Sequence, residues 1–207
     1  MLWYLLAALA APSPAEGHPL FYWGARPPIV TVETGADGGT EARVVEVHAA
    51  VDSAGLVLRF TFDRPVAEAL HLPDGSPVSG RLSASLYVDA DDDRGTGFDQ
   101  GGSDVRTGAD RRIDIGSVSM AEDPDEKRPA SVLVAATVYA LTREGRRRTL
   151  WRADDESDPK RVSAHGDWVE VRLPAEALTP GPRARLILVT RTGPRDGRLV
   201  TGAVPPP

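Results

Sequence analysis

Five of the aspartates between positions 89 and 110 are the residues of this sequence best suited to bind a metal ion. Carboxylates are hard oxygen ligands, and Ca²⁺ takes roughly six to eight such oxygens at about 2.3–2.6 Å. The glycines that separate the aspartates allow tight turns, which can aim backbone carbonyl groups at an ion. One interpretation of the segment is therefore a structural calcium site formed by Asp89, Asp91, Asp93, Asp104 and Asp110.

A second interpretation of the same aspartates needs no metal and fits the spacing equally well. Asp89 and Asp91 can accept hydrogen bonds from backbone N–H groups of the loop and from Arg111 or Arg112, which would hold the loop closed. The segment departs from an EF-hand, because its glycine lies one place late and Gln100 stands where that motif has a glutamate. Under both interpretations the loop is an ordered structural device.

Alternating apolar and polar residues predict the strands that position this loop. In residues 82–91, Leu86 and Val88 point one way while Asp89 and Asp91 point the other, about 7 Å apart. The same period of two recurs in GLVLRFTF, RRIDI and WVEVRL, and the 20 glycines and 18 prolines favour turns over long helices. We expect an all-β fold, a jelly-roll-like antiparallel β-sandwich of about 8–10 strands. In VVEVHAAV, the pattern assigns to one face Val45, Val47, Ala49 and Val51.

The chain divides into one large domain at residues 40–200 and short flanking segments. Residues 1–15 are an apolar run ending in small residues, which predicts a signal peptide and a secreted or periplasmic protein. A buried N-terminal helix is the alternative; a membrane anchor is disfavoured because the run is too short to span a bilayer. No membrane span is thus expected after signal removal. Residues 16–39 should form an irregular lead-in and first strand, and residues 201–207 a disordered tail.

Composition and missing motifs argue against several functional classes. The chain has no cysteine, which removes disulfides, thiolate catalysis and cysteine-based zinc sites. A net charge of −6 argues against nucleic acid as a partner. Neither a Gly-x-Ser-x-Gly elbow nor a phosphate-binding Gly-x-x-x-x-Gly-Lys is present. The sequence therefore predicts a protein that is not an enzyme, and a hydrolase would need a deep pocket with two converging carboxylates.

Three stretches together resemble a known family. LYVDADDDRGTG, TGADRRIDIG and GDWVEVRLPAEAL, in this order, are similar to bacterial DOMON-like secreted sandwiches related to family 9 carbohydrate-binding modules. The resemblance implies a jelly-roll-like sandwich that binds sugars or haem, or an accessory module of a secreted enzyme. Haem is not expected, because no two of its possible axial ligands have a spacing that indicates a haem site. These possible ligands are Met120, His18, His48, His71 and His165.

Sugar binding usually needs exposed aromatic faces, and three aromatic residues are candidates. They are Trp151, Trp168 and Tyr87, each of which could instead cover a sheet edge or pack under a loop. The run Arg146 to Arg148 indicates a solvated edge strand, or an attraction for an acidic glycan. We expect an exported binding module with carbohydrate as the favoured ligand. The alternative is a structural or protein–protein interaction domain of the cell envelope that has no small ligand.

Overall fold

The computed structural model describes residues 18–32, 40–91, 93, 95–99, 108–120, 131–174 and 177, and the backbone of 185–191 and 197–203. The predicted signal peptide and Asp104 lie outside these residues.

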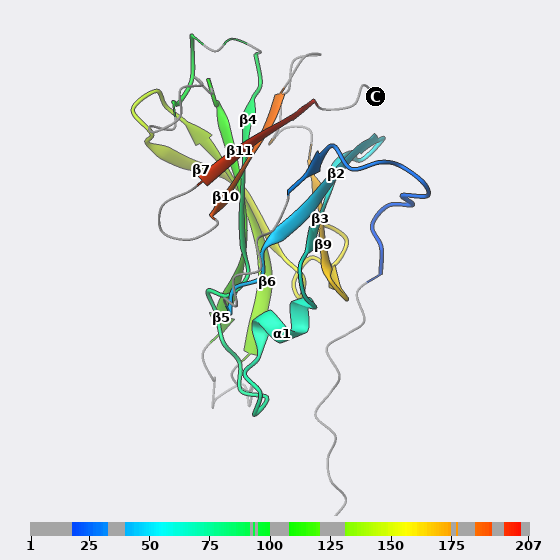
Figure 1. Ribbon diagram of the computed structural model, residues 1–207. Coiled ribbons are helices and arrows are strands. Elements are labelled where there is room, and N and C mark those ends of the chain that lie inside the picture. The colour runs from blue at the N-terminus through cyan, green and yellow to red at the C-terminus, as the bar shows by residue number, and fades with distance from the viewer. Residues whose placement is uncertain are drawn as a thin grey trace, which may run out of the picture.

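Two antiparallel sheets form the molecule and pack face to face (Figure 1). The five-stranded sheet has the order β1 Val30–Thr31, β2 Val44–Asp52, β3 Gly55–Phe62, β9 Trp168–Leu173 and β8 Val162–His165. The six-stranded sheet has the order β11 Gly197–Ala203, β10 Arg185–Arg191, β4 Ser83–Asp89, β5 Arg111–Met120, β6 Ser131–Leu141 and β7 Arg147–Asp154. The predicted all-β antiparallel sandwich is confirmed. The described residues hold eleven strands against the expected 8–10, and β11 extends three residues into the segment predicted as a disordered tail.

The inner faces of both sheets carry the apolar residues that alternation assigned to them. Leu58 and Phe60 of β3 and Ile113 of β5 are fully buried in the core between the sheets. The pattern fails at one place, the start of β2. The β2–β3 register is irregular between Val44 and Glu46, which shifts the alternation of inward and outward side chains by one residue. Val44 therefore enters the core in place of Val45.

A short helix, α1 Val66–Leu70, closes one end of the sandwich (Figure 1). Its apolar residues Val66, Ala69 and Leu70 are buried in the core. The backbone N–H of Val66 donates to the carbonyl of Gly166 at 2.7 Å, which ties the helix to the turn between β8 and β9. Sequence patterning did not indicate this helix, because five residues are too few to show a helical period.

Residues 18–26, which we call the N-terminal strap, lie across the outer face of the five-stranded sheet. Trp23 is only 6% exposed and packs with Ala50 of β2 and Val57 of β3 in a second, smaller apolar cluster. Ser163 of β8 donates its hydroxyl to the carbonyl of His18 at 2.8 Å. This sheet therefore has apolar contacts on both of its faces.

A fully buried glutamate of β9, Glu170, anchors the N-terminal strap. Its Oε1 accepts hydrogen bonds from Trp23 Nε1 at 2.5 Å and Arg59 Nε at 2.8 Å, and the backbone N–H of Leu20 donates to its Oε2. The Arg59 guanidinium lies over the rings of Trp23 and Trp168, at 5.3 and 4.7 Å from their centroids. A buried carboxylate is tolerated only when it is paired and hydrogen-bonded, and here the strap supplies part of that pairing.

We expect Glu170→Gln to lower the free energy of unfolding by about 3 kcal/mol, because it leaves Arg59 without its buried counter-charge. Glu68→Gln on the exposed side of α1 is the matched control and should change stability by less than about 0.5 kcal/mol. Urea denaturation at neutral pH measures both. Similar small effects for the two variants would show that Glu170 is not an anchor.

Candidate functional site

The acidic loop that follows β4 is closed by a short bridge at its base. Phe98 and Ala109 exchange two backbone hydrogen bonds, of 2.7 and 2.9 Å. Gly97, beside this bridge, has a φ of +67°, and a Cβ there would lie 2.5 Å from the backbone of Gly108. The two ends of the loop therefore approach closely, which brings the end of β4 next to the start of β5.

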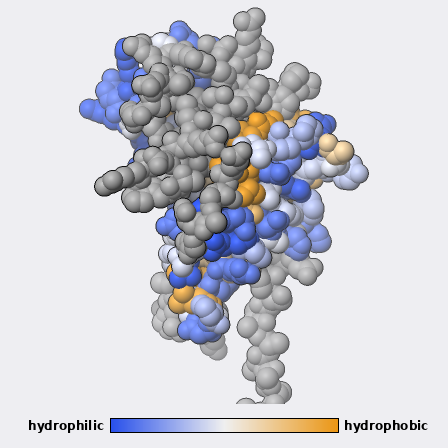
Figure 2. All heavy atoms as spheres, viewed as in Figure 1, coloured by the Kyte–Doolittle hydropathy of each residue, from blue (hydrophilic) through white to orange (hydrophobic). Residues whose placement is uncertain are grey.

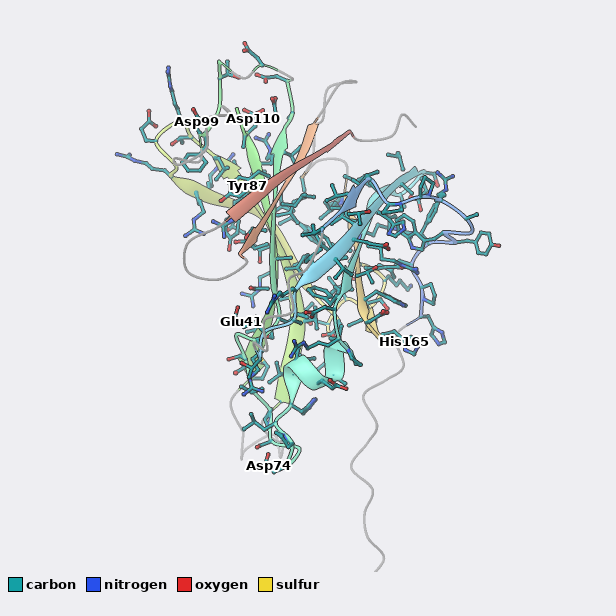
Figure 3. All side chains as sticks on the ribbon, in the orientation of Figure 1. Glu41, Asp74, Tyr87, Asp99, Asp110 and His165 are labelled. Carbon is teal, nitrogen blue, oxygen red and sulfur yellow. The ribbon has the colours of Figure 1, made fainter. Side chains whose placement is uncertain are left out.

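Three carboxylates converge at this closure. Each of Asp89, Asp91 and Asp110 offers an oxygen, and these oxygens lie within 4.8 Å of one another. Asp89 is fully buried, Asp110 is half-buried and Asp91 is exposed, so the group reaches from the interior to the surface. Figure 3 shows Asp110 at the end of the six-stranded sheet, with Tyr87 further along the same sheet. The group could hold a metal ion.

Hydrogen bonds within the loop orient two of these three carboxylates. Asp91 accepts from the backbone N–H of Asp93 and from the Thr96 hydroxyl, each at 2.9 Å, and these bonds lower the pKa of the Asp91 carboxyl. Asp110 Oδ2 accepts from the backbone N–H of Ala90 at 2.9 Å. Loop N–H groups thus contact the carboxylates, as the metal-free interpretation expects. Each bonded oxygen keeps a second lone pair for an ion.

The remaining residues of the two sequence interpretations lie elsewhere. Asp93 directs its carboxylate to the backbone N–H of Gly95 at 2.8 Å and is not one of the three converging residues. Arg112 pairs with Asp114 at 2.5 Å, and Arg111 donates to the backbone carbonyl of Asp110 at 3.0 Å.

The three candidate aromatic residues lie on three different surfaces. Tyr87 is 5% exposed and stacks with Phe98 at a centroid distance of 6.2 Å on the outer face of the six-stranded sheet. Trp151 packs against the core. Trp168 lies on the outer face of the five-stranded sheet, under Arg59. They do not form one platform on which a sugar chain could stack.

Sequence reasoning missed a polar network on the outer face of the six-stranded sheet. Asp114 Oδ1 accepts from Ser85 Oγ at 2.8 Å and from Arg112 Nε, and Arg112 Nη2 contacts Ser85 Oγ at 3.1 Å. Alternation places each of these side chains outward. The sequence therefore indicated that these side chains face outward. It did not indicate that they contact one another, because that depends on the pairing of β4 with β5.

An open hollow of about 710 Å³ lies over the other sheet, lined by residues 18–24 and Arg59. No carboxylate is among the residues that line it, so within the described residues it lacks the two converging acids of a hydrolase. No family model matches the chain, and neither a curated protein nor a solved structure matches it. The likeness to DOMON-like sandwiches therefore stays a prediction.

We expect Gly97→Ala to destabilise the protein more than Gly75→Ala does. Both glycines have positive φ, +67° and +84°, so both alanines carry a conformational cost of about 1–2 kcal/mol. A Cβ at Gly75 meets nothing within 4 Å, whereas one at Gly97 overlaps the backbone of Gly108 and adds about 1–3 kcal/mol of strain. Urea denaturation of the two variants compares them, and equal losses would contradict the close approach at the loop base.

Proposed function

We propose that the protein is a non-enzymatic binding module whose acidic loop holds a structural Ca²⁺ ion. The observation that carries this proposal is the convergence of carboxylate oxygens from Asp89, Asp91 and Asp110 within 4.8 Å. Like charges this close repel one another, and a divalent cation between them converts the repulsion into attraction.

The donor set favours calcium over other metals. All three side chains present oxygen only, which suits Ca²⁺, whereas zinc sites are usually built with histidine or cysteine. Three carboxylates supply three to six oxygens, and loop carbonyl groups and water complete the coordination. The tight loop base at Gly97 fixes the ends of the segment that would carry those carbonyls.

Carbohydrate is the ligand class that we propose for the module, and the secreted or periplasmic location belongs to the same proposal. Among the residues that the structure describes, no helix has the length and apolar character needed to cross a membrane. The second candidate is a protein-interaction domain without a small ligand. It is favoured by the burial of Tyr87 under Phe98 and the packing of Trp151 against the core, which remove two sugar-stacking candidates.

Calcium should raise the thermal stability of the wild-type protein. An ion at about a hundred times its dissociation constant adds about 2.7 kcal/mol to the free energy of unfolding. Asp110→Asn should lose most of this gain at the same calcium concentration, because it removes one of three charges. Asp74→Asn, in an exposed turn far from the loop (Figure 3), is the matched control and should keep it.

Melting curves with calcium and with chelator measure these effects. In chelator, Asp110→Asn should be at least as stable as the wild type, because the substitution relieves repulsion among the carboxylates. A closure made by hydrogen bonds alone gives the opposite pattern: no calcium shift in any variant, and a less stable Asp110→Asn protein in chelator. That pattern would refute the calcium proposal.

A further inference from the structure

Two neighbouring rows of side chains cross strands β4 to β7 on the outer face of the six-stranded sheet. In one row Ser85 pairs with Asp114, Asp114 with Thr137 and Thr137 with Arg152. In the adjacent row Arg112 pairs with Tyr139, two residues further along β5 and β6. The residues between the rows, such as Ile113 and Val138, are buried in the core, so both rows face outward.

The side chains in these rows hold one another in place. Asp114 binds Arg112 and Ser85, and its Oδ2 lies 4.0 Å from Arg147 Nη1. The Arg147 guanidinium lies over the Tyr139 ring, 5.5 Å from its centroid. We call Ser85, Arg112, Asp114, Tyr139, Arg147 and Arg152 the outer strip. It combines an aromatic ring, planar cationic groups and hydrogen-bond acceptors on a rigid sheet.

Positive charge gathers at the β7 edge of the outer strip, although the whole chain has a net charge of −6. The arginines of the β6–β7 hairpin are exposed, and Arg147 keeps 50% of its side chain accessible. The upper left of Figure 2, where Figure 1 shows this hairpin, is strongly hydrophilic. Five exposed arginines lie in this hairpin: Arg143, Arg146, Arg147, Arg148 and Arg152.

We propose that the outer strip binds an acidic polysaccharide, a chain of sugars that carry carboxylates. This inference rests on the proposed function as a carbohydrate-binding module and names its ligand class. Guanidinium groups match carboxylates with two parallel hydrogen bonds, so Arg147 and Arg152 bind the uronate groups. When Arg147 turns toward a uronate it uncovers the Tyr139 ring, on which a pyranose face stacks.

Asp114 makes the outer strip favour a sugar chain over other polyanions. Its carboxylate repels every polyanion, but it also accepts hydrogen bonds from sugar hydroxyl groups, which polyphosphate and polyglutamate lack. Its Oδ1 is already bonded to Arg112 and Ser85, whereas its Oδ2 lies 4.0 Å from Arg147 Nη1 and can accept a hydrogen bond from a ligand. A ligand with both carboxylates and hydroxyls therefore fits the strip better than one with negative charge alone.

Isothermal titration of the wild-type protein with short oligogalacturonates tests the inference. Neutral cello-oligosaccharides and polyglutamate are the comparison ligands. We expect binding of the oligogalacturonates only. This binding should weaken as salt rises from 0.1 M to 1 M, because the screening length then falls from about 10 Å to about 3 Å.

Matched variants locate the binding. Arg152→Glu should weaken the affinity by about fivefold or more, and Tyr139→Leu, which keeps apolar bulk but removes the flat ring, should weaken it similarly. Arg26→Glu, an exposed arginine of the N-terminal strap, makes the same charge change elsewhere and should bind like the wild type. Melting curves confirm that each variant is folded.

The outcomes separate this inference from the calcium proposal. A wild-type protein that gains stability with calcium but binds no oligogalacturonate overturns the outer strip alone. Binding without a calcium shift overturns the calcium site alone. Equal binding of polyglutamate, or an equal loss in Arg26→Glu, also refutes the outer strip, because either result indicates attraction for negative charge in general.

Discussion

The two sheets must bury their inner faces against each other, and this constraint decides on which side of each described strand a charged side chain can lie. Along β4, Leu86 and Val88 point into the core, so Ser85, Tyr87 and Asp89 must point outward. The same parity places Arg112 and Asp114 outward on β5 and Glu170 outward on β9. Polar chemistry is therefore confined to the outer faces and the loop ends, and the two outer faces use it differently.

On the five-stranded sheet, the outer polar groups stabilise the fold. The N-terminal strap covers Glu170, and Trp23 and the backbone of Leu20 replace water as its hydrogen-bond donors. On the six-stranded sheet, the corresponding carboxylate, Asp114, keeps 25% of its side chain exposed and pairs with Arg112, which is 23% exposed. On the five-stranded sheet the strap thus stabilises the carboxylate but closes it off from solvent. On the six-stranded sheet the charged groups are oriented by their neighbours and remain accessible to solvent.

Local sequence determines the direction of a side chain but not what covers it. Alternation correctly directed the core residues of β3 and β5, whereas β4 ends at Asp89, before the alternation predicted for Asp91 could apply. It misplaced Val45, because an irregular register changes the parity and depends on the partner strand. Residue types correctly placed Asp110 in one group with Asp89 and Asp91, but they could not foresee that Trp23 would meet Glu170 across 147 residues. Such meetings depend on strand order, which a single strand's pattern does not contain.

Phe98 connects the base of the acidic loop to the outer face of the six-stranded sheet, where the outer strip lies. Phe98 is held by its backbone bridge to Ala109 at the loop base and stacks on Tyr87, whose ring also lies 5.5 Å from the Arg112 guanidinium. On its other side it packs against the β6–β7 turn, since a Cβ on Gly145 would lie 2.7 Å from the Phe98 ring. An ion bound at the acidic loop would therefore also help to hold Phe98, and through it both Arg112 and the turn that carries the exposed arginines. Calcium binding would in this way preorganise the proposed glycan surface without touching the glycan, because the Phe98 ring contacts both the loop base and the sheet.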